Sequence, residues 1–179
     1  DHGGRYAYRN QPLIAHWNLS MLAQALLPLL HDDPDKALLS GQEAIDQFPD
    51  LFQAAYQNGM RKKLGLTVNE ADDVKLVQDL LSLMQQEKTD FTLTFRRLSD
   101  LADPQKASNS GIDSVFELSD AFDPWLDRWQ QRQLNEPGDI NARQTSMYAI
   151  NPACIARNHL VEQAIEAAGE QQAFEPFPT

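Results

Sequence analysis

The stretch "TVNEADDVKLVQDLLSLMQQEKT" (residues 67–89) decides the fold class, because it has the clearest helical pattern in the chain. Acidic residues gather at its start, where the partial positive charge of a helix N-terminus favours them. Its apolar side chains recur every three or four residues, the spacing of one face of an α-helix, at Val74, Val77, Leu81 and Met84. The pattern predicts a helix that buries this stripe.

Upstream of this stretch, the sequence predicts three helices. The first begins near Pro12, since proline suits a first helical position, and ends around residues 28–30. The second begins after Asp33, a good capping residue, and the third ends at Gly65 after a basic last turn. In the first helix, helical spacing predicts one buried stripe, formed by Ile14, Trp17, Met21, Ala25 and Leu29.

Downstream, "FTLTFRRLSDLA" (residues 91–102) has the β-branched and aromatic content of a strand. Phe91, Phe95 and Leu98 nevertheless keep helical spacing, so we predict a helix that Asp90 opens. The segment at residues 103–112 is the predicted loop, since Asp, Pro, Ser, Asn and Gly are frequent there.

The C-terminal third predicts more helices. "DPWLDRWQQRQL" (residues 123–134) carries two tryptophans on one face, and "INARQTSMYAI" (residues 140–150) makes a further amphipathic stretch. In "NPACIARNHLVEQAIEAAGE" (residues 151–170) we expect Asn151 to cap a last helix that has Pro152 at its first position.

No βαβ pattern, glycine-rich phosphate loop or hairpin signal interrupts this helical pattern. The sequence therefore predicts an all-α protein, with a single helical domain over residues 1–179 and an irregular tail at residues 171–179.

Composition limits the kinds of partner. The net charge of −11 at pH 7 disfavours binding to nucleic acid or to an anionic membrane. The longest apolar run, residues 21–30, is broken by Gln24 and Pro28, so we expect no segment to approach the ~20 residues of a membrane span. A single cysteine, Cys154, excludes an intrachain disulfide, and its apolar neighbours favour a buried position. These observations favour a cytoplasmic protein.

No arrangement of catalytic or metal-binding residues stands out. The four histidines are scattered, without the His-x-x-x-His spacing of a zinc site, and Cys154 has no assignable base. Arg157 falls on the apolar stripe of the last predicted helix, where an unpaired charge is costly. We therefore expect Arg157 to be largely buried and paired with a carboxylate or backbone carbonyls, and a substrate contact stays the alternative.

The segment "GRYAYRNQPLIAHWNLSMLAQALLPLL" (residues 4–30) concentrates aromatic, arginine and amide side chains ahead of an apolar helix. Irregular backbone needs such side chains as hydrogen-bond partners, and a ligand or a neighbouring domain would need them too. The chain begins with "DHGG" and no initiator methionine, so we expect it to be part of a longer polypeptide.

These residues resemble the selenoprotein O/YdiU family. Residues 4–30 look like the segment that follows the family's metal-binding loop, and "NPACIARNHLVEQAIEAA" (residues 151–168) resembles its C-terminal Asn-Pro…Arg-Asn motif. Between them, "RKKLGL", "LLSLMQQEKTDFTLTFRRLS" and "FDPWLDRW" match the family in order and spacing. We assign structural roles to the motif positions Arg5, Tyr6, Asn10, Gln11, Pro12, Trp17, Asn18, Asn151, Pro152, Arg157 and Asn158.

The resemblance implies the C-terminal helical lobe of a protein-kinase-like fold, in a protein that transfers AMP from ATP to Ser, Thr or Tyr of protein substrates. ATP and Mg²⁺ (or Mn²⁺) are the implied cofactors of the full-length protein. The family's nucleotide- and metal-binding residues precede the matching stretch, so we assign no catalytic, cofactor-binding or metal-binding residue to this chain and expect it to be inactive alone. Its implied partners are the upstream catalytic part of the same polypeptide and protein substrates. The alternative is a freestanding α-helical interaction domain without catalysis.

Overall fold

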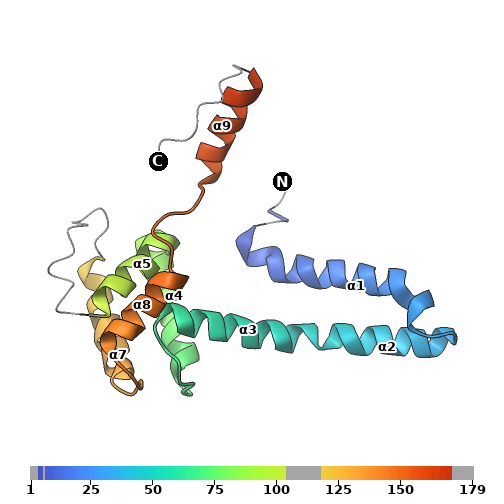
Figure 1. The fold of residues 1–179 in the computed structure, drawn as a ribbon, viewed down its shortest axis with the longest axis horizontal. Coiled ribbons are helices and arrows are strands. Elements are labelled where there is room, and N and C mark those ends of the chain that lie inside the picture. Colours follow the sequence, from blue (N-terminus) through green and yellow to red (C-terminus); the bar gives the residue numbers. More distant parts are fainter. Residues whose placement is uncertain (1–3, 6, 104–117, 171–179) are drawn as a thin grey trace. The chain divides into compact units, whose positions relative to one another are not determined.

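The structure is a computed structural model that describes residues 4–5, 7–103 and 118–170. Within these ranges every regular element is a helix and no strand occurs, so the all-α prediction is confirmed (Figure 1). The tail at residues 171–179 and nearly all of the loop predicted at residues 103–112 lie outside the described ranges.

The chain divides into two compact units, residues 1–60 and 61–179. The prediction of a single domain over residues 1–179 stays a prediction, and each unit is described by itself.

The first unit is built from long helices. The short helix η1 (Tyr8–Asn10) leads into α1 (Gln11–Leu30), which packs along α2 (Pro34–Asp46), and α3 (Phe48–Lys63) begins in this unit. The predicted start of α2 is confirmed, because an Asp33 side-chain oxygen accepts a hydrogen bond from the Asp35 backbone N–H at 3.0 Å.

The predicted buried stripe of α1 is wrong. The Trp17 side chain is 49% exposed, the Leu29 side chain is 81% exposed, and no residue of α1 is buried in the structure. The half-buried residues follow another stripe, which includes His16, Ser20, Ala23 and Leu27. Because leucines surround most of this helix, periodicity alone could not select the face that packs.

One helical stretch, Tyr8–Leu30, has the length and mean hydropathy (1.4) of a membrane span. The expectation that no segment approaches a span is therefore wrong for this stretch. Length and composition alone do not make it a membrane helix, because α1 packs along α2 and core helices of globular proteins pass the same test.

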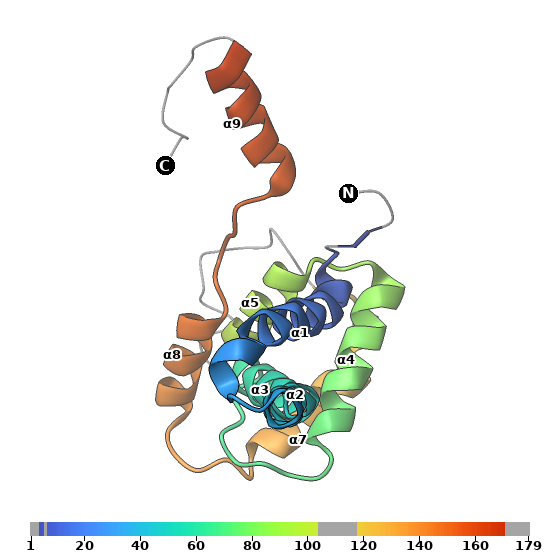
Figure 2. The same ribbon diagram turned by 90° about the vertical axis from the view of Figure 1, so that its right-hand side faces the viewer.

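The second unit packs shorter helices around two tryptophans. It contains the end of α3, then α4 (Asp73–Glu87), α5 (Phe91–Leu101), η2 (Asp120–Phe122), α7 (Asp123–Gln133), α8 (Ile140–Ile150) and α9 (Asn158–Glu170). Helix α4 contacts α7, and α5 contacts α8 (Figure 2). The apolar side chains that lose all or nearly all contact with water are Leu64, Leu66, Leu80, Phe95, Leu98, Phe122, Trp129 and Met147.

The predicted helix at residues 73–87 is confirmed, but its buried stripe is only partly correct. Val77 and Met84 are buried, whereas Val74 is 38% exposed. Leu76 and Leu80 are buried instead of Val74, together with the Asp73 side chain. The apolar residues of α4 form two overlapping stripes. The stripe that packs is the one on the side of the buried Asp73, which pairs with Arg132 of α7.

Two further helix boundaries, the start of α5 and the end of α3, agree with the predicted caps. An Asp90 side-chain oxygen accepts from the Leu93 N–H at 2.9 Å, which begins α5 as a helix rather than a strand. Gly65 adopts φ +72° after the basic last turn of α3, a conformation that favours glycine. A Cβ atom there would lie 2.7 Å from the Met147 sulfur, so the packing of α8 also requires glycine.

The predicted start of the last helix is wrong. Asn151 ends α8 instead of capping a new helix, and α9 begins only at Asn158. The Asn151 amide donates to groups of α3 and α5, so it is not available as an N-terminal cap. Pro152 and Cys154 are consequently exposed in the connecting segment, and the expected burial of Cys154 is also wrong.

Candidate functional site

Several N-terminal motif positions make contacts in the segment that leads into α1. The Arg5 guanidinium lies over the Trp17 ring, 5.3 Å from its centroid, and Asn10 Nδ2 donates to the Gly4 carbonyl at 2.8 Å. The Asn10 amide therefore satisfies a carbonyl of irregular backbone, whereas the Arg5 contact joins two side chains. Tyr6 lies outside the described residues, and Asn18 is exposed.

A groove of about 620 Å³ runs beside this segment in the first unit. Gln11 and Pro12 contribute to its wall, together with Tyr8, Arg9, Ala15, Phe52, Gln53, Ala55 and Tyr56. Burial, with a smaller effect from Tyr8, raises the pKa of Tyr56. The described lining contains aromatic rings, amides and the Arg9 side chain but no carboxylate, histidine or thiol, so it suits an apolar or peptide group and does not suit a metal ion.

The C-terminal motif contains a buried amide that joins three helices. Asn151 is 0% exposed, and its Nδ2 donates to the Lys63 carbonyl at 2.8 Å and to Ser99 Oγ at 3.0 Å. Its Oδ1 accepts from Lys63 Nζ at 3.2 Å, and its backbone carbonyl accepts from Arg96 at 3.1 Å. Asn151 therefore ties α8 to the end of α3 and to α5.

We expect Asn151→Ala to lower the free energy of unfolding by about 2 kcal/mol, because the Lys63 carbonyl and the Ser99 hydroxyl oxygen would each lose a hydrogen-bond donor. Urea denaturation followed by circular dichroism measures this loss. The control is Asn158→Ala, which removes an exposed amide of the same motif. Equal losses in both variants would contradict the role of Asn151.

Arg157 is paired as predicted but is less buried. Its guanidinium lies 2.7 Å from Asp90 Oδ2, and its side chain is 34% exposed. The hydrogen bond from Arg157 holds the pKa of the Asp90 carboxyl below its usual range. The pair therefore links the segment before α9 to the start of α5. The expected deep burial is wrong: α9 starts one residue after Arg157, so Arg157 does not lie on the apolar stripe of a helix.

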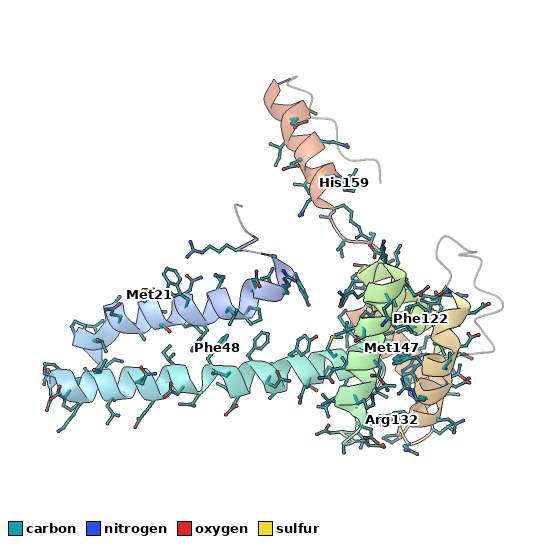
Figure 3. All side chains as sticks on the ribbon, turned by 180° about the vertical axis from the view of Figure 1, so that it is seen from behind. Met21, Phe48, Phe122, Arg132, Met147 and His159 are labelled. Atoms are coloured by element: carbon teal, nitrogen blue, oxygen red, sulfur yellow. The ribbon has the colours of Figure 1, made fainter. Side chains whose placement is uncertain are left out.

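The sequence analysis missed a buried ionic cluster between α4 and α7. Arg132 is labelled in Figure 3. Its Nε lies 2.7 Å from Asp73 Oδ1, and its NH1 lies 2.8 Å from Glu136 Oε1 and 3.3 Å from Glu70 Oε1. The side chains of Asp73, Arg132 and Glu136 are at most 8% exposed. The i, i+4 spacing of Arg132 and Glu136 was the available signal, but it is more common on solvated helix faces.

Burial alone would raise the pKa of Glu136, but hydrogen bonds from Thr67, Val68 and Arg132 outweigh burial and lower this pKa. A carboxylate whose pKa is depressed on folding stabilises the folded state above its unfolded pKa of about 4.3. That contribution is lost as the pH falls through the folded pKa.

We therefore expect the free energy of unfolding to fall between about pH 5 and pH 3, and to fall less steeply in Glu136→Gln. Urea denaturation across this pH range measures both slopes. The Glu87→Gln variant, which alters an exposed carboxylate, serves as the control. Identical slopes for wild type and Glu136→Gln would contradict the role of Glu136.

The described residues contain no group of three or more His, Cys, Asp or Glu side chains that could hold a metal ion. The acidic side chains around Arg132 pair with its guanidinium. Among the described motif positions, Arg5, Asn10 and Trp17 make contacts in the first unit, and Asn151 and Arg157 make contacts in the second.

The described residues thus define an all-helical protein. Residues 1–179 match the family described as "Protein adenylyltransferase SelO", and the chain belongs to this family. The "Protein nucleotidyltransferase YdiU" of Rhodopseudomonas palustris (strain BisB18) is 49% identical over 177 residues, which cover 99% of this chain and 36% of that protein.

Similar values hold for two other relatives that carry the same name. The protein of Methylorubrum populi (strain ATCC BAA-705 / NCIMB 13946 / BJ001) is 47% identical over 184 residues, which cover 100% of this chain and 37% of the relative. The protein of Rhizobium etli (strain CIAT 652) is 48% identical over 177 residues, which cover 99% of this chain and 35% of the relative. The chain therefore spans about a third of the length of the curated relatives it matches.

Proposed function

We propose that this chain is the C-terminal helical part of a protein adenylyltransferase, which transfers AMP from ATP to Ser, Thr or Tyr hydroxyls of protein substrates. The observation that carries this proposal is the family match over residues 1–179. The names of relatives at 47–49% identity support nucleotidyl transfer in the same way.

In this reaction the acceptor hydroxyl oxygen forms a bond to the α-phosphorus of ATP, pyrophosphate leaves, and the hydroxyl proton goes to a base. A divalent metal, Mg²⁺ or Mn²⁺, would neutralise charge on the phosphates. The described residues provide no cluster that fits such a metal, so we derive no step through it from this chain. The nucleotide and the metal would bind to other parts of the longer protein.

The role proposed for this chain is a helical platform, the lower lobe of a kinase-like fold. Its exposed apolar side chains support this role, because contiguous apolar surface usually contacts another protein surface. On α1 these side chains include Leu13, Trp17, Met21, Leu22 and Leu29. We propose that the remainder of the same polypeptide covers them, in a cytoplasmic protein.

The test uses the longer protein that contains this chain, incubated with a protein substrate and ATP labelled on either the α- or the γ-phosphate. Transfer of the α-label to Ser, Thr or Tyr, with release of pyrophosphate, is the expected result. Transfer of the γ-label would overturn the proposal in favour of phosphorylation. Absence of both labels would favour a helical interaction domain without catalysis, for which the groove beside Gln11 is the supporting observation.

A further inference from the structure

Two positively charged side chains next to Asn151 have no carboxylate partner. Lys63 Nζ lies 3.2 Å from Asn151 Oδ1, and an Arg96 guanidinium nitrogen lies 3.1 Å from the Asn151 carbonyl oxygen. Because both side chains bond to the same residue, the two cations lie close together. Within the part of the chain that the structure describes, neither cation forms an ion pair.

Two neighbouring arginines differ from Lys63 and Arg96, because each lies next to a carboxylate. Arg157 pairs with Asp90 at 2.7 Å, and Arg97 lies 3.7 Å from Asp100, which also accepts a hydrogen bond from the Tyr148 hydroxyl. Lys63 and Arg96 therefore form a local positive site in a chain whose net charge is −11.

Aromatic rings hold both cations in place and leave most of their N–H groups unused. Lys63 Nζ lies 5.6 and 5.2 Å from the ring centroids of Phe91 and Phe95, and the Arg96 guanidinium lies 4.2 Å from the Tyr148 ring. A lysine ammonium has three donors and an arginine guanidinium has five, but among the described residues each of these side chains makes one hydrogen bond. Burial also lowers the pKa of Lys63, so a bound anion would compensate an ammonium group that has lost part of its hydration.

We infer that Lys63 and Arg96 bind the side-chain carboxylates of an acidic segment of a partner protein. The flanking Asp90 and Asp100 side chains would repel a dianionic phosphate more strongly than single carboxylates. The first-turn N–H groups of α5, which a phosphate would otherwise use, already face the capping carboxylate of Asp90. Phe91, which is 36% exposed beside Lys63, offers apolar contact to the same segment. The inference does not depend on nucleotidyl transfer.

The test is fluorescence polarisation of a labelled Asp/Glu-rich peptide titrated with the full 179-residue chain, at low salt and again at about 300 mM salt. We expect saturable binding that weakens with salt, and about tenfold weaker binding in Lys63→Gln/Arg96→Gln. The matched control is Lys36→Gln/Lys88→Gln, which removes the same charge from exposed positions and should stay within about twofold of wild type.

Absence of saturable binding to the wild-type chain, or equal loss in the two double variants, would overturn the inference. Tighter binding of a phosphopeptide of equal length, or of a short oligonucleotide, would overturn the assignment to carboxylates. If Lys63→Gln/Arg96→Gln does not fold, Lys63→Gln alone decides, because glutamine can still donate to Asn151. Unchanged affinity in that single variant would also contradict the inference.

Discussion

Replacement of Trp129 by alanine is expected to lower the free energy of unfolding of the second unit by about 4 kcal/mol. Trp129 is 0% exposed, and its indole N–H donates to the Leu64 carbonyl at 3.0 Å. Its ring stacks on Trp125 with 5.9 Å between the ring centroids. The substitution removes this contact area, leaves a cavity between α4 and α7, and takes a donor from the turn after α3.

Chemical denaturation followed by circular dichroism at 222 nm measures this loss, since this signal does not depend on the removed fluorophore. The matched control is Trp17→Ala, because the Trp17 side chain is 49% exposed and contacts Arg5. The control should lose about 1 kcal/mol or less. Losses of similar size in both variants would contradict the assignment of Trp129 to the core.

The second large effect is expected for Arg132→Met, which should cost about 3–5 kcal/mol. The methionine preserves much of the side-chain volume but removes the cation between Asp73 and Glu136, whose side chains are 2% and 1% exposed. Two buried carboxylates would then face each other without a cation between them, although backbone and Thr67 donors would remain.

Thermal and urea unfolding at pH 7 measure this cost. The control is Arg128→Met on the same helix, whose guanidinium pairs with Asp79 at 2.8 Å but is 51% exposed. Solvent screens this exposed pair, so the control should lose much less stability than Arg132→Met. A control variant that is as unstable as Arg132→Met would contradict the importance of burial.

The sequence predicted the helices well where local chemistry sets their ends. Asp33 followed by Pro34, Asp90 before α5, and Gly65 after a basic turn each mark a boundary that the structure has. These signals are local, because a cap bonds to backbone within one turn of its own position.

The sequence could not predict which faces and charges the tertiary structure brings together. The face of α1 was ambiguous because apolar residues surround most of this helix. The partner of Arg157, Asp90, lies 67 residues away in the chain, and the contacts of Arg132 with Asp73 span 59 residues. Asn151 followed by Pro152 looks like a helix start, but long-range bonds to Lys63 and Ser99 make Asn151 the end of α8 instead.

We propose that residues 1–179 supply helical structure to an adenylyltransferase whose nucleotide site lies outside these residues. Calorimetric titration of Mg–ATP into this chain alone, with the longer protein as the positive control, tests it most directly. We predict no saturable heat from the chain and stoichiometric binding by the longer protein. Micromolar, stoichiometric binding to the chain alone would contradict the claim and would place the nucleotide site within residues 1–179.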